Sequence, residues 1–256
     1  MRITGKTWVA GASLLATALM FGGHAMAGGS IKDQPEEPKR GVWFGGTDFA
    51  NGATYSFDGI IVAFNRDISK SGWALRAYGS YLEFDQDPTG DGRAWQGDLM
   101  LGYLFNRSNL YGGIFVGVDY QNYKLKPDDP TAGVRGTEWG AKIAADLATG
   151  RDGPHYFAIA GSYSTAFDSY WSRVRGGFNR GRYTFGVEGS AFGNEDFDAQ
   201  RLGGFVMFDL NILPKMPIEV TFSAGHQFVN DSGTGGTIST GGGEGAYATI
   251  VFSSAF

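Results

Sequence analysis

The sequence predicts an all-β protein, an antiparallel transmembrane β-barrel of twelve strands that forms after an N-terminal signal peptide is removed. Three observations predict this fold. The first residues have the form of a secretory signal, and segments of about ten residues then alternate between apolar and polar positions. The final segment also alternates and ends on Phe256. Together these features are typical of bacterial outer-membrane proteins.

Residues 1–27 have the three parts of a cleavable signal peptide. Arg2 and Lys6 supply positive charge, an apolar stretch runs from Trp8 to Phe21, and Ala25-Met26-Ala27 is a small-x-small cleavage site. The apolar stretch is shorter than the ~20 residues that a membrane helix needs. We therefore expect cleavage after Ala27, export to the outer membrane, a polar periplasmic lead-in at residues 28–40 and a barrel at residues 41–256.

The composition suits a sheet with one face in lipid. Charged residues make up 18% of the chain, below the roughly 25% typical of soluble domains, and there are 20 Phe and 12 Tyr. Removing Arg2 and Lys6 from the 21 basic residues leaves 19 against 26 acidic ones, a net charge of −7. This balance argues against a nucleic-acid partner. With no cysteine, the chain has no disulfide and no Cys-ligated metal.

Period-2 alternation and turn signals predict twelve strands, most of them long enough to cross a membrane at a tilt. We expect them near Gly41–Phe49, Ser56–Asn65, Trp73–Phe84, Trp95–Phe105, Leu110–Leu125, Thr137–Leu147, Tyr156–Thr165, Tyr170–Phe178, Tyr183–Phe192, Gln200–Leu210, Ile218–Phe228 and Ala246–Phe256.

The connections alternate in length, as expected of short periplasmic turns and longer outer loops. Turns such as Asn106–Asn109 and Asn179–Arg182 are short and basic, whereas the seventh connection is shorter, and the sixth longer, than this pattern predicts. The predicted outer loops are acidic and rich in Gly or Pro: Asp85–Ala94, Lys126–Gly136, Gly193–Ala199 and Val229–Gly245.

The fourth connection permits a register prediction. If Arg107-Ser108 forms a two-residue hairpin loop, Leu99 pairs with Val116 on the lipid face, and Gln96 lies opposite Asp119 inside the barrel. The register thus separates apolar from polar side chains, as a barrel wall requires.

A second hairpin and the alternation predict a charged lumen. If Arg180-Gly181 forms the loop, Arg173 lies opposite Glu188 as an inward ion pair. Such a lumen could be an ion-lined pore, or the charges could pair and fill it, because unpaired buried charge is costly. The sequence leaves both alternatives open. The predicted inward residues are Arg76, Asp98, Asp119, Glu138, Lys142, Arg173, Arg175, Glu188, Arg201, Asp209 and Glu219.

Aromatic residues gather near the predicted outer rim, where they form either an interfacial girdle or a surface for stacking on sugar rings. They are Tyr120, Tyr123, Phe167, Tyr170 and Trp171.

The chain offers little for catalysis or metal binding, so we predict no enzyme activity, no cofactor and no metal site. Only His155 and His226 follow the signal segment. A Ser-His lipase would need a serine nucleophile two residues after His226, but that residue is Phe228. Asp85 and the acids after it approach a calcium-loop spacing, but Gln96 stands where the closing carboxylate is needed.

Several strings in order carry a resemblance to a known family. They lie at residues 65–69 with 72–73 and 75–76, 97–103, 117–122, 127–130 with 134–136 and 138, 162–167 with 170–173, and 193–194 with 198–201. The chain resembles the BcsS family of cellulose biosynthesis proteins over essentially all of residues 41–256. The resemblance marks seven positions to test: Asp119, Asp129, Arg135, Glu138, Trp171, Arg173 and Arg201. It also favours the interpretation of the rim aromatics as a glucan contact.

The resemblance implies an outer-membrane barrel accessory to cellulose biosynthesis or secretion, in an export, anchoring or scaffold role. A small porin-like solute channel is the alternative, and a membrane-embedded lipid-modifying enzyme is the third hypothesis. The implied partners are outer-membrane lipids, cellulose or its synthesis and secretion machinery, and the barrel-assembly machinery, which would recognise the C-terminal strand that ends at Phe256.

Overall fold

The computed structural model describes residues 38–86, 90–213, 216–230 and 242–256. The predicted signal peptide and residues 28–37 of the predicted lead-in lie outside this range. The described residues form twelve strands and one short 3₁₀ helix, η1 (Ala166–Asp168). The strands are β1 (Gly41–Ala50), β2 (Ala53–Ala63), β3 (Gly72–Gln86), β4 (Gly90–Arg107), β5 (Leu110–Lys126), β6 (Gly136–Thr149), β7 (His155–Ser164), β8 (Tyr170–Arg180), β9 (Tyr183–Asn194), β10 (Phe197–Leu213), β11 (Met216–Asn230) and β12 (Gly245–Ala255).

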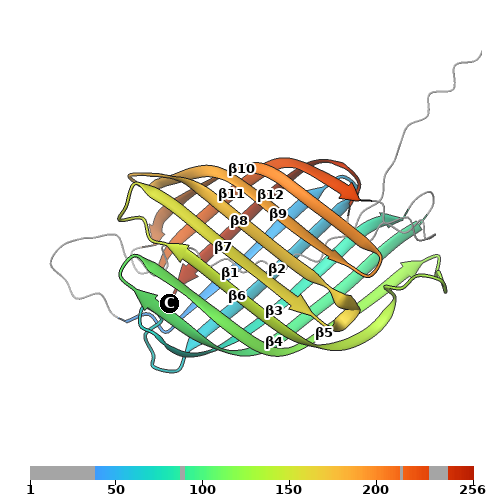
Figure 1. Cartoon of the computed structure of the whole chain (residues 1–256), viewed down its shortest axis with the longest axis horizontal. Helices are drawn as coiled ribbons and strands as arrows, with labels where there is room; N and C mark the ends of the chain where they lie inside the picture. Colours follow the sequence, from blue (N-terminus) through green and yellow to red (C-terminus); the bar gives the residue numbers. More distant parts are fainter. Residues whose placement is uncertain (1–37, 87–89, 214–215, 231–241) are drawn as a thin grey trace, which may run out of the picture.

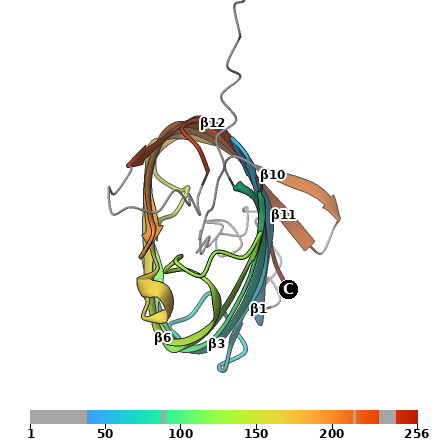
Figure 2. The same ribbon diagram turned by 90° about the vertical axis from the view of Figure 1, so that its right-hand side faces the viewer.

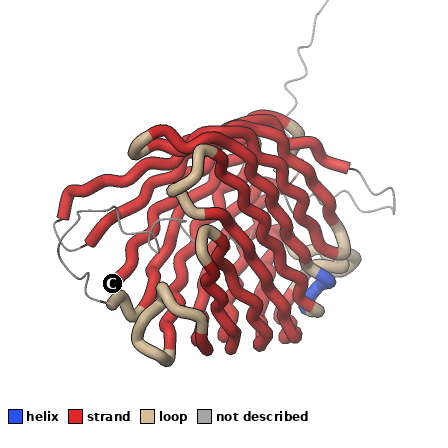
Figure 3. Tube along the Cα trace, turned by 60° about the vertical axis from the view of Figure 1, so that its left-hand side comes forward, coloured by secondary structure: helices blue, strands red, loops and turns tan. Residues whose placement is uncertain are grey.

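The strands close into a single antiparallel barrel, as the sequence predicts. Each strand pairs with its neighbours in the chain, and β1 pairs with β12 from Val42↔Ala255 to Phe49↔Ala248. The strands cross the barrel axis obliquely, and the connections lie at its two ends (Figures 1 and 3). Closure leaves no sheet edge unpaired, which is the condition for a sheet to cross lipid. Among the described residues, no helix is long and apolar enough to cross a membrane.

The predicted alternation separates two faces of the wall. On β4, Trp95 and Leu99 are 56% and 51% exposed on the outside, whereas Gln96, Asp98 and Met100 are buried on the inside. The same division holds on neighbouring strands, so the outer surface carries the apolar side chains and the lumen carries most of the charged ones. This arrangement suits a barrel surrounded by lipid.

Aromatic pairs mark two levels on the outside of the barrel. Near the predicted outer end Tyr120 packs against Trp139 with ring centroids 4.9 Å apart, and near the predicted periplasmic end Trp73 packs against Tyr103 at 5.7 Å. The aliphatic side chains between these levels include Val116, which is 57% exposed. Two aromatic levels around an aliphatic band are the usual exterior of an outer-membrane barrel.

The β4–β5 hairpin has the predicted faces but a different register. The loop is Ser108-Asn109, because Arg107 pairs with Leu110, and Leu99 therefore faces Val118, where we predicted Val116. Ser108 occupies the first loop position with φ +56°. A shift of two residues returns each side chain to the same face, so the inside and outside assignments hold.

The β8–β9 hairpin shows the same two-residue shift. Gly181, with φ +61°, takes the first loop position, and Arg175 pairs with Glu188. The prediction that Arg173 lies opposite Glu188 is wrong, since Arg173 lies opposite Ser190. The physical reason is the positive φ at the first loop position, which glycine adopts without strain and arginine does not.

Two predicted outer loops are mostly strand. In the predicted loop Asp85–Ala94, β3 continues to Gln86 and β4 begins at Gly90, and the predicted loop Gly193–Ala199 is reduced to residues 195–196 between β9 and β10. β4 has 18 residues, whereas a membrane crossing needs about 9–11. The β3–β4 hairpin therefore rises above the β1–β2 hairpin. At this end of the barrel, the pairing of β2 with β3 stops at Ala53↔Phe84. This step leaves a notch in the outer rim.

Candidate functional site

The candidate functional site is the barrel interior, which holds most of the charged residues predicted to face inward. The first cluster joins β3, β4, β5 and β6. Lys142 donates to Asp98 at 2.8 Å and to Asp119 at 3.4 Å, and Arg76 lies 3.6 Å from Asp98. The side chains of all four residues are at most 1% exposed. Gln121 also donates to Asp119 at 2.7 Å. The two carboxylates are thus buried and held by cations and an amide.

The second cluster lies on the opposite wall and centres on Glu188. Arg175 Nε donates to Glu188 at 2.7 Å, and the hydroxyl of Tyr247 donates to the same carboxylate at 2.9 Å. Ser223 accepts a bond from Arg175 and donates to Glu188, which links β8, β9, β11 and β12. Arg175 also lies 4.9 Å from the ring centre of Phe205, which adds a cation–π contact to its hydrogen bonds.

The third cluster is a bidentate ion pair nearer the outer end. Arg201 Nη1 and Nη2 donate to the two oxygens of Asp48 at 2.7 and 2.9 Å, and Arg201 Nε donates to Gln227 at 2.9 Å. Thr249 donates to Asp48 at 2.5 Å, and Arg201 lies 4.4 Å from the ring centre of Tyr247. The pair crosses from β10 to β1, so it ties the last part of the barrel to the first.

An arginine from a turn crosses the predicted periplasmic end of the barrel. Arg151, in the β6–β7 connection, donates to Asp209 of β10 at 2.6 Å and to Glu219 of β11 at 3.4 Å. The Arg151 and Glu219 side chains are 8% and 4% exposed. The arginine therefore reaches across the barrel end and neutralises two acids that the sequence placed inside.

Two of the predicted interior charges are less buried. Glu138 is half-buried near the outer end of β6, opposite Gln121 in the register. Arg173 is half-buried and lies 5.2 Å from the ring centre of Trp171. The other predicted interior charges join the clusters above.

Aromatic side chains fill much of the remaining interior. Phe44, Tyr55, Phe57 and Tyr78 pack together on β1–β3, and the hydroxyls of Tyr55 and Tyr78 hydrogen-bond to each other. All four are at most 6% exposed. Because large rings and paired charges share the lumen, the wall encloses a packed core in this part of the barrel.

The five aromatic residues predicted at the rim do not form one surface. Tyr123, Phe167 and Trp171 are buried inside, with Tyr123 and Phe167 in edge contact at 5.3 Å. Tyr120 faces outward against Trp139, and Tyr170 donates to Asp198 at 2.6 Å on the outer side of β8. Three of the five therefore belong to the interior packing.

Outer connections lie across part of the barrel mouth, the end that faces the viewer in Figure 2. Val134, in the β5–β6 connection, donates its backbone N–H to Asp196 of the β9–β10 turn at 2.8 Å and is fully buried. Below it, Glu195 donates its backbone N–H to the carbonyl of Phe167 in η1 at 3.1 Å. The loop, the turn and the 3₁₀ helix thus hold one another over the filled lumen.

The sequence matches the family model of the cellulose biosynthesis protein BcsS over residues 42–256. The chain belongs to the BcsS family. The matched range begins in β1 and runs through β12, so it covers the whole barrel and confirms the resemblance carried by the sequence strings.

Comparisons beyond the BcsS family give distant structural likenesses. No curated protein matches the sequence. A FadL homologue from Pseudomonas aeruginosa aligns with 10% identity and a TM-score of 0.39, covering 96% of this chain and 99% of that one. CdiB from Acinetobacter baumannii aligns with 8% identity and a TM-score of 0.36, covering 85% and 60%. The TodX deltaS2S3 mutant, a monoaromatic hydrocarbon channel, aligns with 10% identity and a TM-score of 0.39, covering 86% and 91%.

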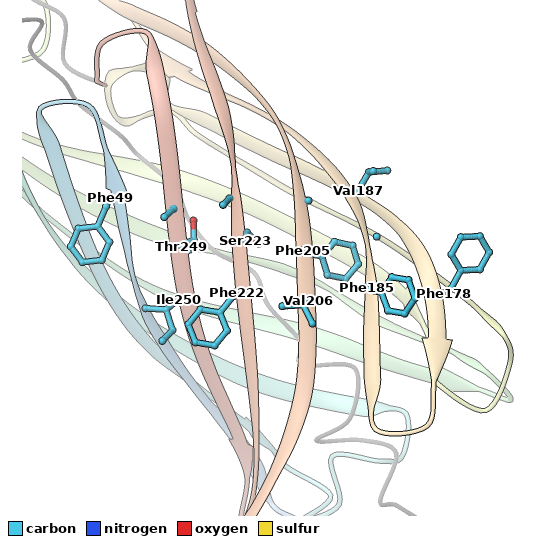
Figure 4. Close-up of a pocket in the computed structure, with 14 residues that line it drawn as sticks. Phe49, Phe178, Phe185, Val187, Phe205, Val206, Phe222, Ser223, Thr249 and Ile250 are labelled. Atoms are coloured by element: carbon cyan, nitrogen blue, oxygen red, sulfur yellow. The ribbon is translucent and has the colours of Figure 1, made fainter.

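The BcsS-family barrel also carries a groove of about 820 Å³ on its outer wall (Figure 4). Gly204, Ala224 and Ala248 form its floor, and Phe222 and Ile250 are among its larger apolar walls. The three small residues lie side by side in the register of β10, β11 and β12. The groove faces the lipid side, so it is not a passage through the barrel, and its lining suits an acyl chain.

The two histidines in the described part of this BcsS-family chain, His155 and His226, lie away from the interior clusters. His226 is on the outward face, with its ring 4.8 Å from Phe228 and its Nε2 3.7 Å from Glu244. Its partners in the register are Leu202 and Ala246, which offer no nucleophile. Within the part of the chain that the structure describes, no three His, Asp or Glu side chains are grouped to hold a metal ion.

Asp48 and Arg151 are interior residues that the sequence reasoning missed. Both parities of β1 carry large apolar residues, Trp43 outside and Phe44 inside, so alternation did not identify the inward side of Asp48. Arg151 lies in a turn, where period-2 patterns say nothing about direction. An unpaired Arg201 in the predicted lumen was the available signal that an inward acid was still to be found.

Proposed function

We propose that this barrel resides in the outer membrane and serves cellulose biosynthesis as a closed anchor or scaffold, with the glucan passing elsewhere. Membership of the BcsS family supports the link to cellulose biosynthesis. The closed barrel with an apolar exterior supports the location. Export through the signal segment and assembly through the C-terminal strand stay predictions.

The filled lumen is the observation that carries the choice of a scaffold over a duct. A glucan chain moving through this barrel would have to separate the Arg201–Asp48 pair and displace Arg151 from Asp209. Each separation leaves buried charges unpaired, which costs several kcal/mol. The same pairing argues against the porin-like alternative. A sugar-stacking role stays a prediction for Tyr120 and Tyr170, because the other three aromatics are buried.

The decisive experiment locks the mouth and measures cellulose. A Cβ built on Gly133 would lie 2.6 Å from Asp196 Oδ1, so cysteines at these two positions are close enough for a disulfide. The chain has no other cysteine to interfere. A deletion strain is complemented with Gly133→Cys/Asp196→Cys, and each single variant serves as control.

The scaffold predicts that deletion reduces cell-attached cellulose and that the locked barrel restores it to the wild-type level. A duct predicts that the locked barrel fails to secrete and that a reductant restores secretion. Normal amounts and attachment of cellulose in the deletion strain would contradict the proposed function altogether.

A further inference from the structure

The outward wall of β1–β4 interrupts the apolar exterior with a small patch of polar and very small residues. We name it the β1–β4 patch: Gly45, Thr47, Ser56, Asp58, Gly79 and Gly97. In the register Gly45 faces Asp58, Asp58 faces Gly79, and Gly79 faces Gly97, so these four residues form one row across four strands. Thr47 and Ser56 pair above them with their hydroxyls 3.2 Å apart.

The carboxylate of Asp58 lies between the two aromatic levels, nearer the outer one. Its partner Gly79 on β3 is two residues from Tyr81, which packs against Trp95 at the outer level, and six residues from Trp73 at the other level. Asp58 is also in the middle of β2, an 11-residue strand of about the length that crosses a membrane. It is exposed and makes no ion pair or hydrogen bond within the described part of the chain. An ionisable side chain at this depth is costly and indicates a function with a partner of opposite charge.

Two glycines of the patch are small without a packing reason. A Cβ built on Gly79 would have its nearest atom at 4.0 Å, and one built on Gly97 at 3.6 Å. By contrast, a Cβ on the inward Gly117 would lie 2.1 Å from the nearest atom, and Gly176 on β8 is an outward glycine that is open in the same way but lies outside this row. The wall therefore has room for the bulky apolar side chains that lipid favours, and glycine leaves the surface flat for close approach of another backbone.

An aromatic ring and a notch extend this surface. The ring of Trp43 lies over Gly45, next to Asp58, where a guanidinium that paired with the carboxylate would also meet an indole edge or face. Above the patch, the step between the two hairpins forms a notch of about 480 Å³ lined by Glu83, Asp85 and Arg93, among others. Arg93 lies 3.6 Å from Glu83 and pairs with it, so the unpaired charge of the β1–β4 patch is that of Asp58.

We propose that the β1–β4 patch is a lateral docking surface for another outer-membrane protein, one that presents an arginine or lysine to Asp58 within the membrane. This inference deepens the proposed scaffold role by naming the face and the charge through which the scaffold holds its partner. A second copy of this chain docked symmetrically on the patch would set Asp58 against Asp58 in a low dielectric, which is repulsive. A lipid chain has no charge to offer.

The test uses a single cysteine placed in the cysteine-free chain. Ser56→Cys, labelled in intact outer membranes with a photoactivated maleimide, samples what lies against the patch. Asp58→Lys reverses the charge and Gly79→Leu fills the flat surface in the same background. Gly176→Leu is the matched control, since Gly176 is an outward glycine on β8 with open space around it. Heat-modifiable migration in gels confirms that every variant is folded.

We expect a discrete heteromeric adduct that falls about tenfold or more with Asp58→Lys and with Gly79→Leu, as loss of a desolvated charge pair or of contact implies. Gly176→Leu leaves the adduct unchanged. Mass spectrometry of the adduct then identifies the partner and a basic residue of the partner near the crosslink. Changing that residue to Asp should restore crosslinking of the partner to the Asp58→Lys variant.

Three results would overturn the proposal: no discrete adduct, an adduct of twice the chain mass, or an adduct that ignores both patch variants. Cellulose in the deletion strain is measured separately. An adduct without a cellulose defect would refute the proposed function and support the docking surface. A cellulose defect without an adduct would support the proposed function and refute the docking surface.

Discussion

Removal of Arg201 tests most sharply how the interior stabilises the barrel. Arg201→Met keeps much of the side chain's length but leaves Asp48 without its bidentate partner, and both side chains are only 6% exposed in the native pair. Breaking a buried pair on one side costs about 3–5 kcal/mol, because the remaining charge stays buried and uncompensated. That cost lowers the folding equilibrium by a factor of about a hundred to a few thousand.

The matched variant is the double change Asp48→Leu with Arg201→Met. It removes both charges at once, so the free energy of unfolding of the double variant should lie within about 1–2 kcal/mol of the wild-type value. The assay is urea-dependent folding into lipid vesicles, read by heat-modifiable migration, with all four members of the cycle measured. The two single losses would then exceed the double loss, giving a large coupling energy.

The opposite result would refute the reasoning. If each single variant cost less than about 1 kcal/mol and the two losses added, the pair would behave like a solvent-exposed ion pair. Water would then fill this part of the lumen, and the interior could not be described as packed.

Three further predictions concern single residues. Asp146 is buried, and neither oxygen of its carboxylate has a hydrogen-bond partner in the described residues, so Asp146→Asn should stabilise the barrel by about 1–2 kcal/mol in the same urea assay; a loss of stability would count against this. Partial desolvation and the nearby carboxylates of Asp168, Glu138 and Asp196 raise the pKa of the exposed Glu195 above its ordinary 4.5, so the folded state loses stability as the pH rises through that value; because solvent screens an exposed charge, Glu195→Gln should raise the melting temperature only slightly at pH 7 and leave it unchanged below about pH 4; a pH-independent effect would be inconsistent. A Cβ on Gly92 would lie 1.9 Å from the Phe84 ring, so Gly92→Ala should lower the melting temperature, whereas Gly79→Ala, in open space, should not; equal effects would show that the packing contact is not the cause.

The strand order and the two faces of the wall could be predicted because alternation depends only on local sequence. Trp95 and Leu99 lie outside, and Asp98 and Lys142 lie inside, as period 2 requires. The register could not be predicted to the residue, since it depends on which loop residue takes a positive φ, as Gly181 does. A two-residue error of this kind preserves every face and still assigns the wrong ion pair.

The partners across the lumen could not be predicted at all. Arg201 and Asp48 are 153 residues apart, and their contact follows from closure of β1 against β12. The reach of Arg151 to Asp209 depends on the direction of a turn. Strand length was also underestimated on β4, because Gly90 and Gly92 resemble loop residues while they pair with β3.

Conductance of the purified barrel in a planar lipid bilayer tests the closed interior most directly. A lumen filled by paired charges and aromatic rings predicts an electrically silent protein, with no regular current steps at moderate voltage. Reproducible ohmic steps from folded wild-type barrel, altered in size when Arg201 or Arg175 is replaced, would contradict the closed scaffold and favour a channel.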